Sequence, residues 1–91
     1  MKIIASNHFI RFKKKSHKNL QLEIDEQVKK ILEDPEIGEL KKGDLRGIRV
    51  HKFTFKSQLY LVSYEVIGET LNLYIIGTHE NFYDRLKNLL Y

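Results

Sequence analysis

The stretch that decides the fold is residues 48–78, which read IRVHKFTFKSQLYLVSYEVIGETLNLYIIGT. Its β-branched and aromatic residues favour strands, and two short breaks divide it into three parts. The breaks are Lys56-Ser57 and Ile67-Gly68-Glu69, both short enough to join antiparallel neighbours. The stretch therefore predicts an antiparallel meander of three strands, Ile48–Phe55, Leu59–Val66 and Leu71–Thr78.

The middle strand of the meander alternates cleanly between two faces. One face carries Tyr60, Val62, Tyr64 and Val66, whereas Ser63 and Glu65 point the other way. The first strand is less regular, because its aliphatic residues occupy one parity and its phenylalanines the other (Ile48 and Val50, Phe53 and Phe55). A β-bulge, or a sheet covered on both faces, would explain this change of parity.

The segments that flank the meander predict three helices and one more strand. Residues 2–5 form a strand candidate, and Ser6 can cap a short helix after it. Ser16 or Asn19 opens a second helix, which carries one apolar stripe and ends before Pro35. Thr78 can cap a last helix, whose apolar stripe is Phe82, Leu86 and Leu89. The connection 36–47 has no clear period, and a connection this long is often functional.

Together these elements predict an α+β fold in the order β-α-α-β-β-β-α. We expect a small antiparallel sheet with the two N-terminal helices packed on one face. The 91 residues suit a single domain, residues 1–91. The chain has no cysteine, which excludes disulfides and thiolate zinc sites. The apolar run near Met1 is too short for a signal peptide or a membrane span, so we expect a cytoplasmic protein without membrane contacts.

The net charge of +4 is unevenly distributed along the chain. Residues 1–18 carry six basic residues and no acid, residues 19–40 carry seven acids against two lysines, and residues 41–56 carry six basic residues against Asp44 alone. Such blocks favour one surface for a polyanion and another that is acidic and solvated. The run Lys13–Lys15 alone is more typical of ordinary solvated surface, whereas the block 41–56 is interleaved with aromatic residues, as in RNA-binding surfaces.

Three segments, taken in order, resemble the RelE/ParE superfamily of toxins from type II toxin–antitoxin systems. Gly43-Asp44-Leu45-Arg46-Gly47 resembles the family's approach to a basic strand, and Tyr60-Leu61-Val62-Ser63-Tyr64-Glu65-Val66 resembles its central strand. Gly77-Thr78-His79-Glu80-Asn81-Phe82-Tyr83 resembles the closing motif of the YafQ-type ribonucleases. The resemblance implies the same fold and, as the first expectation, metal-free cleavage of messenger RNA. It departs at Leu61, where many ribonuclease members carry an arginine that Arg49 or Lys52 would have to replace.

Cleavage of RNA through its own 2′-hydroxyl needs a base, cations at the phosphate and a proton donor for the leaving oxygen. His79 is the first candidate for the base. A position just after Thr78 would lie in the first turn of the last helix, where the helix dipole favours a phosphate and disfavours a charged imidazolium, so that the histidine stays neutral. From spacing alone it could equally be a polar residue at a helix start, and the resemblance favours the functional interpretation. His51 and Arg49 share one side of their strand and are candidate partners. Tyr83 is the candidate aromatic for stacking or proton transfer.

Four further basic residues of the 41–56 block are candidates for binding RNA phosphates, namely Lys41, Lys42, Arg46 and Lys52. The four histidines have no metal-ligand spacing and there is no nucleotide-binding glycine loop, so we expect neither a metal nor a cofactor. The expected partners are a cognate antitoxin, messenger RNA and the ribosome. Two alternatives remain: a ParE-like inhibitor of DNA gyrase without nuclease activity, and a plain basic RNA-binding module.

Overall fold

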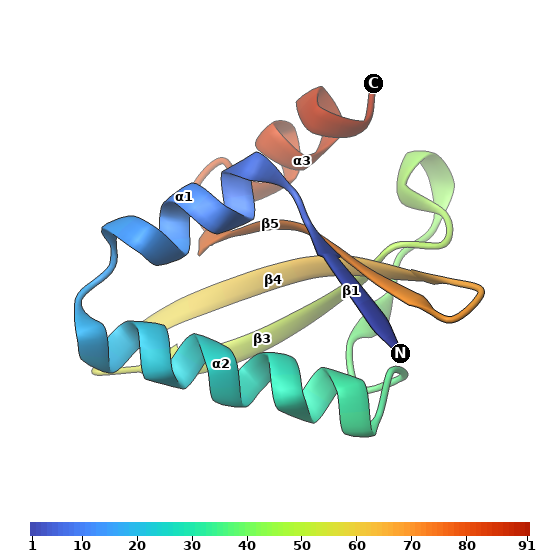
Figure 1. Cartoon of the computed structure of the whole chain (residues 1–91). Helices are drawn as coiled ribbons and strands as arrows, with labels where there is room; N and C mark the ends of the chain where they lie inside the picture. Colours follow the sequence, from blue (N-terminus) through green and yellow to red (C-terminus); the bar gives the residue numbers. More distant parts are fainter.

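Nine elements follow one another along the chain, and the computed structural model describes all of residues 1–91 (Figure 1). They are β1 (Lys2–Ala5), α1 (Asn7–Lys15), α2 (Lys18–Glu33), β2 (Glu39–Leu40), the 3-10 turn η1 (Gly43–Leu45), β3 (Arg49–Phe55), β4 (Gln58–Ile67), β5 (Thr70–Thr78) and α3 (Phe82–Leu90). The five strands make one sheet in the order β1-β5-β4-β3-β2. The predicted α+β class and the order of the predicted elements are confirmed.

The sheet is mixed, not wholly antiparallel as predicted. Strands β3, β4 and β5 form the antiparallel meander, but β1 pairs with β5 in parallel. This pairing joins residues about seventy positions apart, and backbone bonds hold both ends of β1: Lys2 N donates to Glu69 O and Ser6 N to Leu73 O, each over 2.9 Å. The two-residue strand β2 lies inside the connection 36–47 and pairs with β3; the sequence did not indicate this strand.

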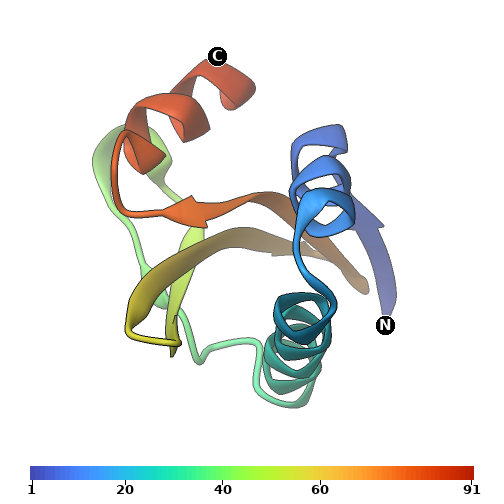
Figure 2. The same ribbon diagram turned by 90° about the vertical axis from the view of Figure 1, so that its left-hand side faces the viewer.

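Both faces of the sheet are covered, which accounts for the parity change in β3. Helices α1 and α2 lie over one face, and α3 with the segment around η1 covers the other (Figure 2). Phe53 belongs to the core beneath α1 and α2, whereas Val50 belongs to the core beneath α3. The β-bulge lies elsewhere, in β5, because Ser63 pairs with Ile75 but Tyr64 pairs with Leu73, which leaves Tyr74 as the extra residue.

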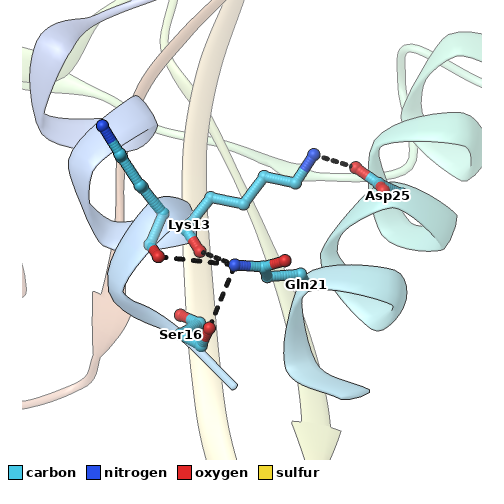
Figure 3. Close-up of polar contacts among 5 residues, drawn as sticks. Lys13, Ser16, Gln21 and Asp25 are labelled. Atoms are coloured by element: carbon cyan, nitrogen blue, oxygen red, sulfur yellow. Dashed lines mark hydrogen bonds and ion pairs between the residues drawn. The ribbon is translucent and has the colours of Figure 1, made fainter. Parts of the chain in front are cut away.

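The corner between α1 and α2 is fixed by side chains that cap the end of α1 (Figure 3). Ser6 caps its start as predicted, accepting from Phe9 N. At its end the Gln21 amide donates to Lys13 O over 2.9 Å and to Ser16 O over 3.0 Å. The Ser16 hydroxyl donates back to Phe12 O over 2.7 Å. The predicted start of α2 at Ser16 or Asn19 is therefore wrong, because Ser16 ends α1 and His17 precedes α2.

Helix α3 begins later than predicted. Thr78 is still in β5, where it pairs with Tyr60, and the cap residue of α3 is Asn81, with a left-handed φ of 58°. The sheet ladder holds Thr78, so the chain needs the turn 79–81 before it can enter the helix. None of the helices combines the length and apolar character needed to span a bilayer.

Candidate active site

The residues of the closing motif gather where β5 passes into α3. His79 lies exposed in the turn between them, three residues before the first helical residue. Its ring centroid is 6.1 Å from that of Tyr83, which it meets edge-on. Phe82 enters the core with 1% exposure, as predicted, and leaves Tyr83 half-buried at the surface. The turn 79–84 encloses a shallow pocket of about 250 Å³.

The predicted position of His79 in the first turn of the last helix is wrong, because the helix begins at Phe82 after the cap residue Asn81. What brings His79 into the site is its contact with Tyr83 and the end of β5. The sequence could not reveal this start, since Thr78 and Asn81 are both acceptable cap residues.

Lys41 extends the site toward the opposite edge of the sheet. Its Nζ lies 5.2 Å from the centroid of the Tyr83 ring and forms an ion pair with Glu39. The hydrogen bond to Glu39 is the main cause that raises the pKa of Lys41, and Tyr83 adds to it. The same bond lowers the pKa of the Glu39 carboxyl, with smaller contributions from the charges of Lys41 and Lys52. Lys41 is therefore a cation at neutral pH and Glu39 an anion.

Lys52 lies on the same face as Tyr83. It pairs in register with Leu61, and Leu61 pairs with Gly77, so the three form one row across β3, β4 and β5. Leu61 belongs to the core under α3, which assigns the row to that face. Leu61 is fully buried, so a side chain at this position cannot reach a ligand without displacing part of α3.

Arg85, which the sequence analysis did not single out, lies over the end of this row. A Cβ built on Gly77 would come 3.7 Å from Arg85 Nη1 and 3.9 Å from Nη2. The guanidinium therefore lies against a strand position that has no side chain. The sequence held one signal for this, since a glycine inside a strand often marks a close approach, but nothing in it indicated which residue approaches.

Arg49 and His51 share a face, as predicted, but it is the face opposite His79. Arg49 Nη1 donates to the carbonyl of Gly38 over 2.8 Å and fixes the segment between α2 and β2. His51 is 8% exposed beneath α2, and its Nε2 lies 2.6 Å from Gln27 Oε1. An amide oxygen only accepts, so the ring nitrogen donates.

Burial is the main cause that lowers the pKa of His51, and the charge of Lys30 adds to it. The expected grouping of His51 and Arg49 with His79 is thus not what the structure gives. Strand alternation predicted that the two share a side, but it could not say which side α3 covers.

Lys42 and Arg46 lie exposed on the segment 41–48, beside the site. Leu45 anchors this segment in the core under α3, and Tyr91 donates a hydrogen bond to the carbonyl of Asp44. Both cations are therefore presented on an anchored loop. No three histidine, cysteine or acidic side chains converge as metal ligands would.

The arrangement brings an imidazole, a phenol and the cations Lys41, Lys52 and Arg85 to one face of the sheet. Cations of this kind bind phosphates, and an imidazole beside a phenol can move protons at neutral pH.

The fold defines the class of this protein. The chain has a TM-score of 0.68 to a chain of the intact Escherichia coli RelBE toxin–antitoxin complex, at 18% identity over 87% of this chain and 96% of that one. The score is 0.70 to a free mutant of the E. coli toxin RelE, at 16% identity over 97% and 90% of the two chains. The isolated RelE toxin gives 0.66, at 17% identity over 96% of each chain. The chain therefore has the RelE fold.

The family is shown by the sequence itself. Residues 3–87 match the ParE-like toxins of type II bacterial toxin–antitoxin systems. The chain belongs to this family, and the resemblance to the RelE/ParE superfamily is confirmed. No curated protein sequence gives a significant match.

Proposed function

We propose that this toxin cleaves messenger RNA, on the ribosome or free, without a metal. The observation that carries the proposal is the convergence of His79, Tyr83 and Lys41 on the face that also holds Lys52 and Arg85. A histidine, a phenol and three cations on one surface are what transfer of a phosphoryl group from the 5′ oxygen to the 2′ oxygen requires.

In the proposed reaction the RNA 2′ oxygen attacks the adjacent phosphorus and the bond to the 5′ oxygen breaks. His79 accepts the 2′ proton, and the Tyr83 hydroxyl delivers a proton to the leaving oxygen. The products are a 2′,3′-cyclic phosphate and a 5′-hydroxyl. Lys41 keeps its charge throughout, because its pKa is raised, and it stabilises the negative charge that develops on the phosphoryl oxygens.

Arg85 is the proposed replacement for the strand arginine of many ribonuclease members. Position 61 is a buried leucine, and Arg49 is bonded to carbonyls on the other face. Arg85 reaches the same cross-strand row from α3, above Gly77. Its planar guanidinium can hold two phosphate oxygens, which Lys52 at the other end of the row cannot do alone.

We propose a cognate antitoxin as the second partner. An open groove of about 690 Å³ runs between α1, α2 and β1, with Ile3, Phe9, Ile10 and Val28 among its apolar lining residues and Lys14 and Lys29 at its rim. Ile3 and Ile10 are about half exposed, at 46% and 50%. An antitoxin segment with apolar and acidic residues would cover this surface and match its charge.

The test is cleavage of a defined messenger in a translating extract, read by primer extension with and without ribosomes. Wild-type protein should give discrete cuts, and His79→Ala should lose them. His8→Ala is the matched control, because His8 lies exposed on α1, outside the site, and should cut like the wild type. Equal cutting by His79→Ala would remove His79 from the mechanism.

Intact RNA with folded wild-type protein would favour the other candidate, a gyrase inhibitor. The observation in its favour is the family match, which is to the ParE-like toxins. A supercoiling assay with purified gyrase would then replace the cleavage assay.

A further inference from the structure

A second pocket lies at the end of the sheet where β3 turns into β4. It has a volume of about 450 Å³ and is lined by His17, Asn19, Leu20, Phe55, Lys56, Gln58 and Tyr60. None of its lining residues is acidic. Figure 2 views this end of the molecule, with the start of α2, the β3–β4 turn and the end of β5 toward the reader.

The aromatic residues of this pocket are held in place by the core. The Tyr60 ring stacks on Phe53 with centroids 5.4 Å apart and planes 20° from parallel, and Phe12 meets its edge at 6.2 Å. Phe55 is half-buried beside it, with Lys56 Nζ 5.5 Å from its ring centroid. Fixed aromatic surfaces next to a cation suit the stacking of an unpaired base and the binding of its phosphate.

The turn that presents Lys56 is not built for stability. Lys56 and Ser57 have φ of 50° and 67°, so both central residues of this two-residue hairpin are left-handed. Asn-Gly is the sequence that such turns favour, and other side chains strain the backbone by about 1 kcal/mol each. The turn geometry therefore does not explain why a lysine stands at position 56. The position of Lys56 in the lining of a pocket without acidic residues does explain it.

Further cations lie at the corner between α1 and α2, next to the pocket residue His17 in the chain. Lys14, Lys15 and Lys18 are exposed there. The corner is ordered, because the Gln21 amide bonds the last carbonyls of α1 and Lys13 is paired with Asp25 (Figure 3). Of this basic segment, Lys13 and Lys14 line the apolar groove between α1 and α2, whereas Lys18 lies between the pocket residues His17 and Asn19 in the chain.

The pocket and the proposed active site lie at the same end of the sheet. Tyr60 pairs with Thr78 on the neighbouring strand, and His79 is the next residue along the chain. Neighbouring β-strands are about 4.8 Å apart. A single-stranded RNA that passes around this end of the sheet would therefore meet both the pocket and the proposed active site.

We propose that this pocket binds a nucleotide of the RNA that flanks the scissile phosphate. Its base stacks on Phe55 and Tyr60, and its phosphate contacts Lys56 and His17. The inference rests on the proposed ribonuclease function, and it assigns a site outside the catalytic residues. It would set where along an RNA the toxin prefers to cut.

The test uses the double variant Lys56→Asn/Ser57→Gly, which introduces the favoured turn sequence and removes the cation. We expect its Tm to rise and its RNA binding to weaken several-fold. The probe is a fluorescein-labelled, ten-nucleotide 2′-O-methyl RNA, which cannot be cleaved, and the readout is fluorescence anisotropy over a range of salt concentrations. The slope of log affinity against log salt should fall by about 0.7, the value for one lost phosphate contact on a single strand.

Ser57→Gly alone is the matched control and should gain stability with unchanged binding. Lys29→Asn removes a cation from the antitoxin groove and should also bind like the wild type. Unchanged affinity and slope in the double variant would overturn the inference. Binding is measured on an uncleavable probe, so the binding result does not depend on cleavage. An absence of cleavage by the wild type would refute the proposed ribonuclease function, whereas the binding data alone decide whether the pocket binds RNA.

Discussion

Glu39 puts a carboxylate into the cationic surface of the proposed active site. It forms an ion pair with Lys41, and Lys52 helps to lower the pKa of its carboxyl. A substrate phosphate must compete with this carboxylate for the same cations. At the scale of single residues, we therefore expect Glu39 to oppose the proposed RNA binding while it holds Lys41 in position.

We predict that Glu39→Gln binds the uncleavable RNA probe several-fold more tightly than the wild type at low salt. The variant removes one negative charge from the site, and the gain should shrink as salt screens the charges. Glu33→Gln is the matched control, because Glu33 is exposed at the end of α2. Weaker binding by Glu39→Gln would show instead that Glu39 serves mainly to orient Lys41.

His51 makes the stability of the fold dependent on pH. Its pKa in the folded protein is lowered by burial, so the unfolded chain binds a proton more readily below its ordinary value of 6.5. We predict that the contribution of His51 to the free energy of unfolding is constant above that pH and falls as the pH drops below it, by at most about 1.4 kcal/mol per pH unit.

Urea unfolding of wild type and His51→Gln between pH 5 and pH 8 measures this effect. The variant should lose most of the slope between pH 6.5 and pH 5, and His8→Gln should keep it. An equal slope in wild type and His51→Gln would contradict the assignment of His51 as a buried, neutral residue.

At the scale of elements, the Tyr64 hydroxyl joins the sheet to the segment that leads from α2 to β2. It donates to Pro35 O over 2.7 Å and accepts from Gly38 N over 2.9 Å. A Cβ at Gly38 would come 2.8 Å from two atoms of this side chain. Tyr64, which is part of the segment that resembles the family's central strand, thus fixes the backbone just before Glu39 and Lys41.

We predict that Tyr64→Phe lowers the free energy of unfolding by about 1–3 kcal/mol, because it leaves a buried donor and acceptor without their partner. Tyr60→Phe is the control on the same strand and face, since the Tyr60 hydroxyl makes no hydrogen bond within the protein, and it should change stability little. Urea denaturation compares the two. Equal stabilities would contradict the role assigned to Tyr64.

The elements that could be predicted from the sequence are those whose patterns are local. The alternation of β4, the stripe of α3 and the cap at Ser6 needed only neighbouring residues. The parallel pairing of β1 and the short strand β2 depend on distant partners. The predicted start of α3 was wrong for a similar reason, since pairing with Tyr60 keeps Thr78 in the sheet.

The candidate site was predictable in part for the same physical reason. His79, Tyr83 and Lys41 do lie together, but the sequence also grouped them with Arg49 and His51, which occupy the other face. Alternation along a strand separates two faces without naming the helix that covers each. Arg85 was missed because its contact with Gly77 depends on how α3 packs.

At the scale of the whole molecule, the two faces of the sheet carry different surfaces. The face under α1 and α2 has the apolar groove proposed for the antitoxin, and the face under α3 has the proposed active site. Of the basic blocks seen in the sequence, Lys13–Lys15 and Lys18 lie at the α1–α2 corner and Lys41, Lys42 and Arg46 lie around η1, and four of the twelve acidic residues lie on α2. We therefore propose different surfaces for the antitoxin and for the scissile phosphate of the RNA, with the proposed nucleotide pocket at the end of the sheet that holds His79 and Tyr60.

We propose that the toxin cuts RNA by attack of the RNA's own 2′-hydroxyl on the adjacent phosphorus, with His79 as the base. The most direct measurement identifies the ends of the fragments from a defined messenger, with a matched messenger that lacks the 2′-hydroxyl at the mapped cut. We predict 2′,3′-cyclic phosphate ends that disappear with the deoxy messenger and with His79→Ala. Fragments with 3′-hydroxyl ends, cutting at the deoxy position, or intact RNA with folded wild-type protein would each contradict it.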